Sequence, residues 1–297
     1  MKFFQLIRQR SLVYLSVFLI ATLSQSAALA ANSFPNGILW KVEYPGVPSS
    51  YLFGTIHIED PRVTHLPAAV SKAFDTSNSL TLEINPSAGA MASVAQQMLY
   101  QDGRTLEHVL GKDLYQRTAA ELKKHGIPPQ MTTLLKPWAA MITLIAPQQK
   151  TGVFLDYALY LKSTEQGKTF YALETLDEQL SVFTQLTERD QVALLKDTLN
   201  QLPTQKQTFE ELTQAYLARD LDKLLTISKE QMPSSPRLSE RMDKRLVSDR
   251  NLRMYKRAQQ QLKQGKAFIA VGALHLPGKH GLLQLLVNHG YRVTPVY

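Results

Sequence analysis

Two seven-residue stretches near opposite ends of the chain share one pattern: YLFGTIH at residues 51–57 and IAVGALH at residues 269–275. Each begins with an apolar run typical of a buried β-strand and ends with Gly-x-x-His. A proline follows each histidine within a few residues, and then come a short segment with helical spacing and another apolar strand pattern. This repetition predicts two βαβ-like halves that build one central sheet.

The elements expected around these two stretches form the first and last zones of the chain. The first zone is β-rich, with predicted strands at 38–42, 50–53 and 80–84 and one short helix at 66–74. The last zone returns to strand, helix and strand, predicted at 267–271, 282–288 and 291–296. Neither zone has enough residues to form a hydrophobic core alone, so both belong to one domain.

The long middle of the chain, about residues 87–265, is predicted to be a helical insertion between the two halves. Proline and glycine separate its helical patterns, which include 114–125, 137–145, 152–162 and 188–202. A single strand pattern interrupts them at 168–173. The predicted fold class is therefore α/β, with α+β as the alternative, in a single domain over residues 31–297.

The first thirty residues have the pattern of a signal peptide. Lys2, Arg8 and Arg10 precede an apolar run at 11–23, and Ala28-Leu29-Ala30 supplies the small residues of a cleavage site. The run of about 13 residues is shorter than the roughly 20 that span a bilayer, and no later run is longer. We therefore expect an exported protein, periplasmic or secreted and most simply in a Gram-negative periplasm, with no membrane span after cleavage.

The net charge of +8, from 33 Lys and Arg against 25 Asp and Glu, is concentrated in two segments. The N-terminal thirty residues hold three basic side chains, and residues 234–266 hold ten against three acidic ones. Few aromatic residues are interleaved with these charges, so nucleic acid is not an expected partner. The absence of cysteine excludes a disulfide scaffold, a thiolate metal site and a cysteine nucleophile.

The two Gly-x-x-His units predict a metal site. A glycine at a strand exit permits a sharp turn, and the carboxyl ends of parallel strands form the crevice where ligands bind. Two imidazoles brought together there, His57 and His275, suit a divalent metal. Glu83 is the candidate third ligand, because a carboxylate inside the apolar strand 80–84 is costly unless it is paired. The alternative is a solvent-facing Glu83 on an edge strand.

The remaining histidines are expected at the surface. Of these five, only His280 stands close in sequence to a candidate ligand, five residues after His275. All lie among polar neighbours: His65, His108, His125, His280 and His289. Because the chain has no thiolate, any metal must be bound by nitrogen and oxygen atoms. Such a ligand set is compatible with Mn, Fe, Co and Zn.

Six short motifs occur in a characteristic order: GTIH at 54–57, Leu82-Glu83, Lys136-Pro137-Trp138, LET at 173–175 with Glu178-Gln179, Arg250-Asn251, and GALHL at 272–276. This order resembles the TraB/PrgY/GumN family, also called TIKI-type. The segment DPRV at 60–63, with Leu66-Pro67, further resembles the bacterial GumN-like members. The resemblance runs from about Leu39 to the C-terminus.

The resemblance implies a fold akin to the erythromycin-esterase and ChaN-like proteins. It also implies a divalent-metal site made of His57, Glu83 and His275, which agrees with the ligands selected above from the residues alone. The animal members resemble metalloproteases that clip a secreted ligand with manganese or cobalt. A hydrolase acting on peptide bonds is therefore the expected activity.

Arg250 and Glu174 are the predicted catalytic residues. Arg250 is expected either to pair with a site carboxylate or a developing oxyanion, or to face water within the basic segment. Glu174 is expected either to act as a general base or positioning residue, or to belong to the cap of the helix that Thr175 and Glu178 begin. Asp156 is assigned a structural role.

Two further helical features follow from local pattern. Lys136-Pro137-Trp138 predicts a helix start with the tryptophan packed inward. The basic segment 234–266 predicts one or two solvated helices, with Leu246, Leu252 and Tyr255 as a buried stripe.

Two functions remain open from the sequence. The first is an exported divalent-metal-dependent hydrolase that acts on peptide bonds or on a small molecule. The second is a non-catalytic periplasmic protein that captures haem, a peptide or a partner, since histidines in a cleft also ligate haem iron. No pattern in the sequence identifies the substrate or the oligomeric state.

Overall fold

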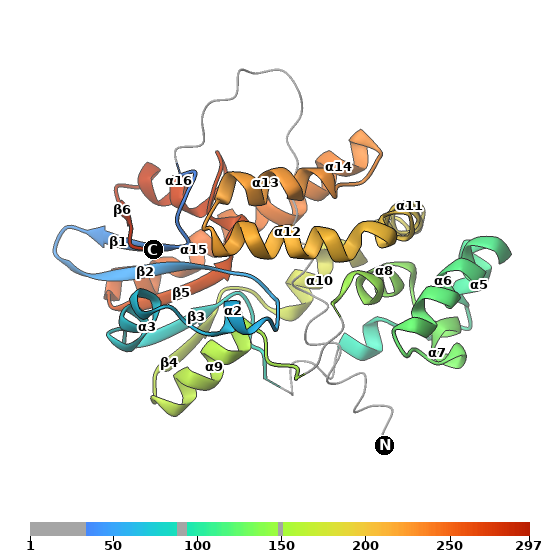
Figure 1. Ribbon diagram of the computed structural model, residues 1–297, viewed down its shortest axis with the longest axis horizontal. Coiled ribbons are helices and arrows are strands. Elements are labelled where there is room, and N and C mark those ends of the chain that lie inside the picture. Colours follow the sequence, from blue (N-terminus) through green and yellow to red (C-terminus); the bar gives the residue numbers. More distant parts are fainter. Residues whose placement is uncertain (1–33, 88–93, 148–150) are drawn as a thin grey trace.

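The computed structural model describes residues 34–87, 94–147 and 151–297, so the predicted signal peptide lies outside the described residues. Its centre is a six-stranded mixed sheet of order β4-β3-β5-β2-β1-β6 (Figure 1). The strands are β1 (Leu39–Tyr44), β2 (Val47–Thr55), β3 (Ser79–Leu82), β4 (Thr169–Ala172), β5 (Ala267–Gly272) and β6 (Arg292–Pro295). Strands β4, β3, β5 and β2 are mutually parallel, whereas β1 is antiparallel to both β2 and β6.

The two predicted βαβ halves are present and interleave in this sheet. In the first half, β2, α3 and β3 follow one another along the chain, but β5 from the second half lies between the two strands. In the second half, β5, α16 and β6 follow one another, with β2 and β1 between those strands. Because β5 lies between the strands of the first half, and β2 and β1 lie between those of the second, neither half forms a sheet alone.

Helices surround and extend the sheet. They are α2 (Pro61–Thr64), α3 (Ala68–Asp75), α5 (Leu106–Leu110), α6 (Lys112–Lys124), α7 (Pro129–Leu134), α8 (Pro137–Ile145), α9 (Leu155–Glu165), α10 (Leu176–Thr184), α11 (Glu188–Gln201), α12 (Gln205–Leu217), α13 (Leu221–Glu230), α14 (Pro236–Asp243), α15 (Asp249–Gln264) and α16 (Leu282–Asn288). Helix α9 packs against β3 and β4, and α15 packs against β2 and β5. Figure 1 shows α5, α6 and α7 at the end of the molecule away from the sheet.

The described residues form two hydrophobic clusters. One surrounds the sheet, where β5 is buried over nearly its whole length, as expected for a central parallel strand with both faces covered. The other lies within the helical insertion around Trp138, which is fully buried on α8. Pro137 stands at the start of that helix, so the predicted helix start with an inward tryptophan is confirmed.

The two Gly-x-x-His glycines allow close packing at the strand ends. A Cβ on Gly54 would lie 2.7 Å from Leu276 Cδ1 and 3.0 Å from Ala273 Cα, both in the loop of the other unit. A Cβ on Gly272 would lie 3.3 Å from Glu83 Oε1. The glycines therefore let the two loops and the Glu83 carboxylate meet at one edge of the sheet.

The basic segment differs from its prediction in one respect. It forms α14, a π-helical turn at Lys244–Ser248 and α15. Leu246 and Tyr255 are buried as predicted, but Leu252 is 46% exposed, so its assignment to the buried stripe was wrong. Arg250 and Asn251 lie inward instead, next to Met254 and Tyr255, because that face of α15 contacts the strand ends described below.

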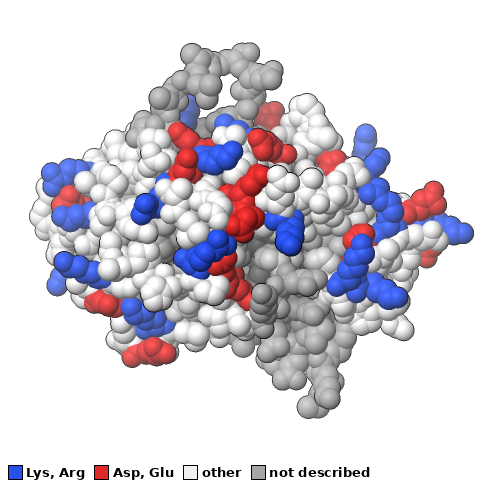
Figure 2. Space-filling view, in the orientation of Figure 1, with Lys and Arg blue, Asp and Glu red and all other residues white. Residues whose placement is uncertain are grey.

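Two surface properties complete the fold. On the face drawn in Figure 2, Lys and Arg side chains are interspersed with Asp and Glu. Across the described parts of the chain, no helix is both long enough and apolar enough to cross a membrane.

Candidate functional site

Each of the four parallel strands is followed, at its carboxyl-terminal end, by a polar side chain on the same side of the sheet. Glu83 directly follows β3, His57 and Glu174 come two residues after β2 and β4, and His275 comes three residues after β5. In the spatial order of the sheet the side chains are Glu174, Glu83, His275 and His57. All four are buried. The carboxyl ends of the strands therefore gather the predicted residues, as the fold type leads one to expect.

Glu83 lies slightly differently from its prediction. The strand ends at Leu82, so Glu83 is the first residue beyond it rather than a residue inside a strand 80–84. Its side chain is nevertheless buried, with the residue only 4% exposed, and the solvent-facing alternative was wrong.

His57 is oriented by the start of α9. Its Nδ1 lies 3.2 Å from Asp156 Oδ2, and Thr55 Oγ1 donates to the other oxygen of Asp156 at 2.9 Å. The loop before α9 is fixed in turn, because Glu59 accepts the backbone N–H groups of Thr151 at 2.9 Å and Gly152 at 2.7 Å. A carboxylate against Nδ1 leaves Nε2 as the nitrogen available to a ligand.

His275 is oriented by α15 and is completely buried. Its Nδ1 lies 2.5 Å from Asn251 Oδ1, while Asn251 Nδ2 donates to the backbone carbonyls of His275 at 3.3 Å and His280 at 2.7 Å. Since these two carbonyls require the NH₂ group of the amide, Oδ1 is the atom that faces the imidazole. Nδ1 is therefore the donor, and Nε2 has a free lone pair.

Glu83 is held by three donors. Its Oε1 accepts the Gly272 N–H at 2.6 Å, and its Oε2 accepts Arg250 Nη2 at 2.5 Å and Gln179 Nε2 at 3.0 Å. The Oε1 atom also lies 3.6 Å from His275 Nε2. The carboxylate therefore faces the imidazole with a fixed orientation.

Arg250 connects Glu83 to Glu174. It is 1% exposed, and its Nε donates to Glu174 Oε2 at 2.7 Å. The second oxygen of Glu174 accepts Arg253 Nη1, also at 2.7 Å. The prediction that Arg250 pairs with a site carboxylate is therefore correct, and its water-facing alternative was wrong. The capping box next to Glu174 is formed by Thr175 and Glu178.

The protonation states follow from burial and these partners. Burial by itself raises the pKa of Glu83, but the guanidinium of Arg250, then the two imidazoles and the Gly272 N–H, lower it to a net value of about 2. Burial lowers the pKa of His275 to about 3, although Glu83 opposes this shift. At neutral pH the site therefore combines an ionised Glu83 with a neutral His275.

Burial also raises the pKa of the two outer carboxyls. For Asp156 the nearby His57 opposes this shift, and for Glu174 the guanidinium of Arg250 opposes it. Burial therefore disfavours the ionised form of both carboxyls, and a neighbouring basic group offsets part of this effect in each case.

Several buried polar atoms of the site have no hydrogen-bond partner among the described residues. They include both ring nitrogens of His57, Nε2 of His275 and Oδ2 of Asp156, so the 3.2 Å contact between His57 and Asp156 does not have hydrogen-bond geometry. Such atoms are costly to bury unless a ligand or water pairs with them. Two imidazole nitrogens with lone pairs and a carboxylate are the donor types that bind divalent transition metals. Within the described ranges, however, no group of three or more His, Cys, Asp and Glu side chains is already arranged as a metal-binding cluster.

Some residues of this network were not predicted. Asp156 was assigned only a structural role, and Gln179, Arg253 and Asn251 had no assigned role. For Asp156 the available indication was a carboxylate in the first turn of an otherwise apolar helix start, between Leu155 and Tyr157. Of the other histidines, His125 is half-buried and four are exposed: His65, His108, His280 and His289. His280 contributes only its backbone carbonyl to the network, as an acceptor for Asn251.

Comparison with known proteins identifies the chain's relatives. A model of the TraB/PrgY/gumN family matches residues 38–295. A protein named Metalloprotease TIKI2 from Danio rerio is 26% identical, over 87% of this chain and 60% of its own length. An uncharacterized protein named YbaP from Shigella flexneri is also 26% identical, over 88% of this chain and 96% of its own. The chain thus spans about 60% of the length of its TIKI2 relatives. No solved structure matches it significantly.

Proposed function

The chain belongs to the TraB/PrgY/gumN family, and from this membership we propose that it is a divalent-metal-dependent hydrolase that cleaves peptide bonds. The single observation that carries the proposal is the pair of buried, unpartnered Nε2 atoms of His57 and His275 beside the ionised Glu83. The metalloprotease names of the TIKI relatives support the same activity.

His57 and His275 would hold the metal through their Nε2 atoms, and Glu83 through its carboxylate. The donor set is compatible with Mn, Fe, Co or Zn. The chemistry supplied by such a metal, when bound, would be Lewis-acid polarisation of a substrate carbonyl and a lowering of the pKa of water towards neutrality.

The residues around the ligands keep them ready for this role. Asn251 hydrogen-bonds to Nδ1 of His275, which orients that imidazole and leaves its Nε2 available, and the Asp156 carboxylate lies 3.2 Å from Nδ1 of His57. Arg250, Gln179 and the Gly272 N–H keep Glu83 ionised and fixed. We assign Arg250 and Glu174 a positioning role rather than direct contact with substrate, since Arg250 is buried between the two carboxylates.

The location of the protein is part of the proposal. The signal-peptide pattern of residues 1–30 supports export, most simply to a periplasm. Sequencing the N-terminus of the protein recovered from a periplasmic extract tests this, with Ala31 expected as the first residue.

Metal analysis tests the site. We expect the purified protein to bind about one divalent ion per chain and the His57→Ala/His275→Ala variant to lose it. His65→Ala is the matched control, because it removes an exposed histidine in the segment that follows the same strand. Equal metal content in the double variant and the control would remove the basis of the proposal.

Peptide cleavage tests the activity. We expect a mixed peptide library to be cleaved by the metal-loaded protein and not after chelation. A protein that binds metal through these histidines but cleaves no peptide would favour the capture function instead. In that case a Soret band on adding haem, absent from the double variant, identifies haem as the captured ligand.

A further inference from the structure

A row of arginines lines one side of the helix formed by α14, the π turn and α15. They are Arg241, Arg245, Arg253 and Arg257, which recur at intervals of four or eight residues. The last three interact with α10 or with residues next to it, whereas Arg241 interacts with Asp190 on α11. Three of them reach a carboxylate: Arg241 that of Asp190 at 2.6 Å, Arg253 that of Glu174 at 2.7 Å and Arg257 that of Glu178 at 2.6 Å.

Arg245 differs from the other three. Its Nη1 contacts only neutral acceptors, the carbonyl of Ser181 at 3.3 Å and Gln185 Oε1 at 3.4 Å. No carboxylate pairs with it among the residues that the structure describes. It also lies within the π turn, a type of distortion that is frequent at functional sites.

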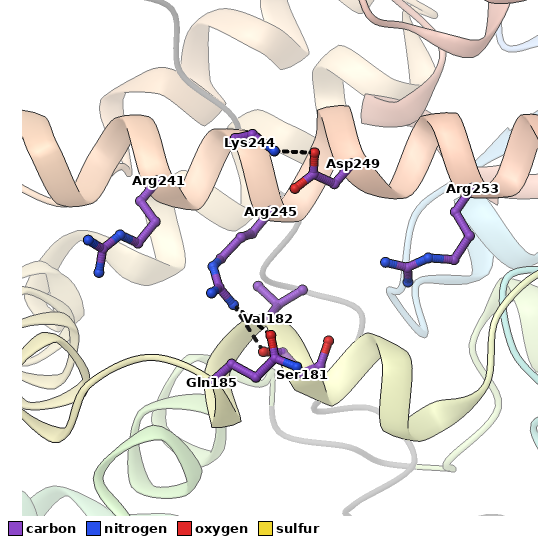
Figure 3. Close-up of a pocket in the computed structure, with 8 residues that line it drawn as sticks. All are labelled: Ser181, Val182, Gln185, Arg241, Lys244, Arg245, Asp249 and Arg253. Carbon is purple, nitrogen blue, oxygen red and sulfur yellow. Dashed lines mark hydrogen bonds and ion pairs between the residues drawn. The ribbon is translucent and has the colours of Figure 1, made fainter.

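Arg241, Arg245 and Arg253 border a pocket of about 350 Å³ between this helix and α10. Figure 3 shows Arg241, Arg245 and Arg253 directed from the helix towards α10, with Arg245 nearest Ser181 and Gln185. The pocket has four basic side chains against one acidic, Asp249, which is itself paired with Lys244 at 2.5 Å. Of the other lining cations, Lys244 pairs with Asp249 and Arg253 with Glu174. Arg241 shares the Asp190 carboxylate with Arg237. Among the described residues, Arg245 is therefore the lining cation that contacts no carboxylate.

The pocket is linked to the candidate metal site by a series of side-chain contacts. Arg253 lines the pocket and contacts Glu174, which contacts Arg250, which in turn contacts Glu83. A group bound in the pocket is therefore separated from Glu83 by this short series of side chains.

We infer that this pocket binds a carboxylate of an acidic peptide, with Arg245 as its partner, and so selects substrates that have an Asp or Glu side chain. The inference rests on the proposed peptidase function for the identity of the ligand. The guanidinium of Arg245, which contacts no carboxylate of its own, matches one carboxylate in geometry, since its planar N–H pair fits two oxygens.

The competing explanation is structural. Ser181 lies in the last turn of α10, so Arg245 would merely cap that helix C-terminus and interact with its dipole. The two explanations differ in what replacing Arg245 does to peptide binding.

The test is binding of rhodamine-labelled peptides to metal-free protein in chelator, followed by fluorescence anisotropy at low salt. Two nonapeptides identical except for a central Glu or Gln are compared. We expect the Glu peptide to bind about tenfold more tightly, and Arg245→Gln to remove that preference. Lys256→Gln is the control, because it removes the same charge from an exposed position of α15 and leaves the pocket intact.

A second variant keeps the test decisive if Arg245→Gln fails to fold. Gln185→Glu puts a carboxylate beside Arg245 at an exposed position, and we expect it to abolish the preference by internal neutralisation. Equal affinity for the two peptides, or equal losses in Arg245→Gln and Lys256→Gln, would overturn the inference. The binding assay needs no cleavage, so the two proposals can fail separately. A protein that prefers the Glu peptide but hydrolyses no peptide would refute only the proposed function. A protein that hydrolyses peptides without preferring the Glu peptide would refute only this inference.

Discussion

Replacing Arg250 by methionine removes the cation that the Glu83 and Glu174 carboxylates share. The guanidinium donates to Glu83 Oε2 at 2.5 Å and to Glu174 Oε2 at 2.7 Å, and both carboxylates are almost inaccessible to solvent. Methionine fills a similar volume but leaves the two negative charges close together in a medium of low dielectric constant. The variant therefore isolates the electrostatic role of Arg250.

The expected loss of stability is large. Removing one partner of a buried ion pair costs about 3–5 kcal/mol, against a total stability of roughly 5–15 kcal/mol. Gln179 and Gly272 still donate to Glu83, and Arg253 still donates to Glu174, so we expect the lower end of that range. In urea unfolding followed by circular dichroism at pH 7 in chelator, the midpoint should fall by about 1 M.

Two companion variants check the reasoning. Arg253→Met is the matched control, because Arg253 contacts only Glu174 of this pair and is about one third exposed; it should cost less than about 1 kcal/mol. Adding Glu174→Gln to Arg250→Met removes one of the unpaired charges and should restore about 1–2 kcal/mol. An Arg250→Met variant that is no less stable than Arg253→Met would refute the account of the buried network.

Three further predictions concern the capping box, the glycine contact and the histidine partner. Arg257 first, and then the Thr175 N–H, lower the pKa of Glu178 from 4.5 to about 2 despite partial burial. The wild type should therefore be more stable than Glu178→Gln by about 1 kcal/mol above pH 4.5, and this difference should vanish in urea unfolding as the pH falls to 2. Gly54→Ala should cost about 1–3 kcal/mol in thermal unfolding, because its Cβ would meet Leu276 and Ala273; an unchanged melting temperature would contradict the close packing of the two loops. Asp156→Asn should weaken Mn²⁺ binding about 10–100-fold in calorimetric titration, whereas Asp113→Asn, at an exposed position, should leave it unchanged.

The local pattern of the sequence was sufficient to predict most elements. The helices at 137–145 and 282–288 begin and end where they were predicted, since proline, glycine and apolar spacing define them locally. Strand β4 is one residue shorter at each end than the predicted 168–173. The interleaved strand order could not be predicted, because pairing of β5 between β2 and β3 depends on contacts between residues far apart in the chain.

The site was predictable to the extent that it depends on strand ends. Gly-x-x-His after two strands identified His57 and His275, and an apolar strand identified Glu83. Asp156 and Asn251 were assigned no partner, because their contacts with the imidazoles join segments that are distant in sequence. Leu252 was assigned inward by its hydrophobicity, yet Arg250 and Asn251 occupy that face, since the buried carboxylate and imidazole need their donors and acceptors.

The central claim is that Nε2 of His57 and Nε2 of His275 bind one divalent ion together with Glu83. Anomalous diffraction from crystals of the protein grown with Mn²⁺ or Co²⁺ measures this directly. The account predicts one strong anomalous peak within coordination distance of both Nε2 atoms and a Glu83 oxygen, lost in the His57→Ala/His275→Ala variant. A metal bound elsewhere in the crystal, with no peak between these two imidazoles, would contradict it.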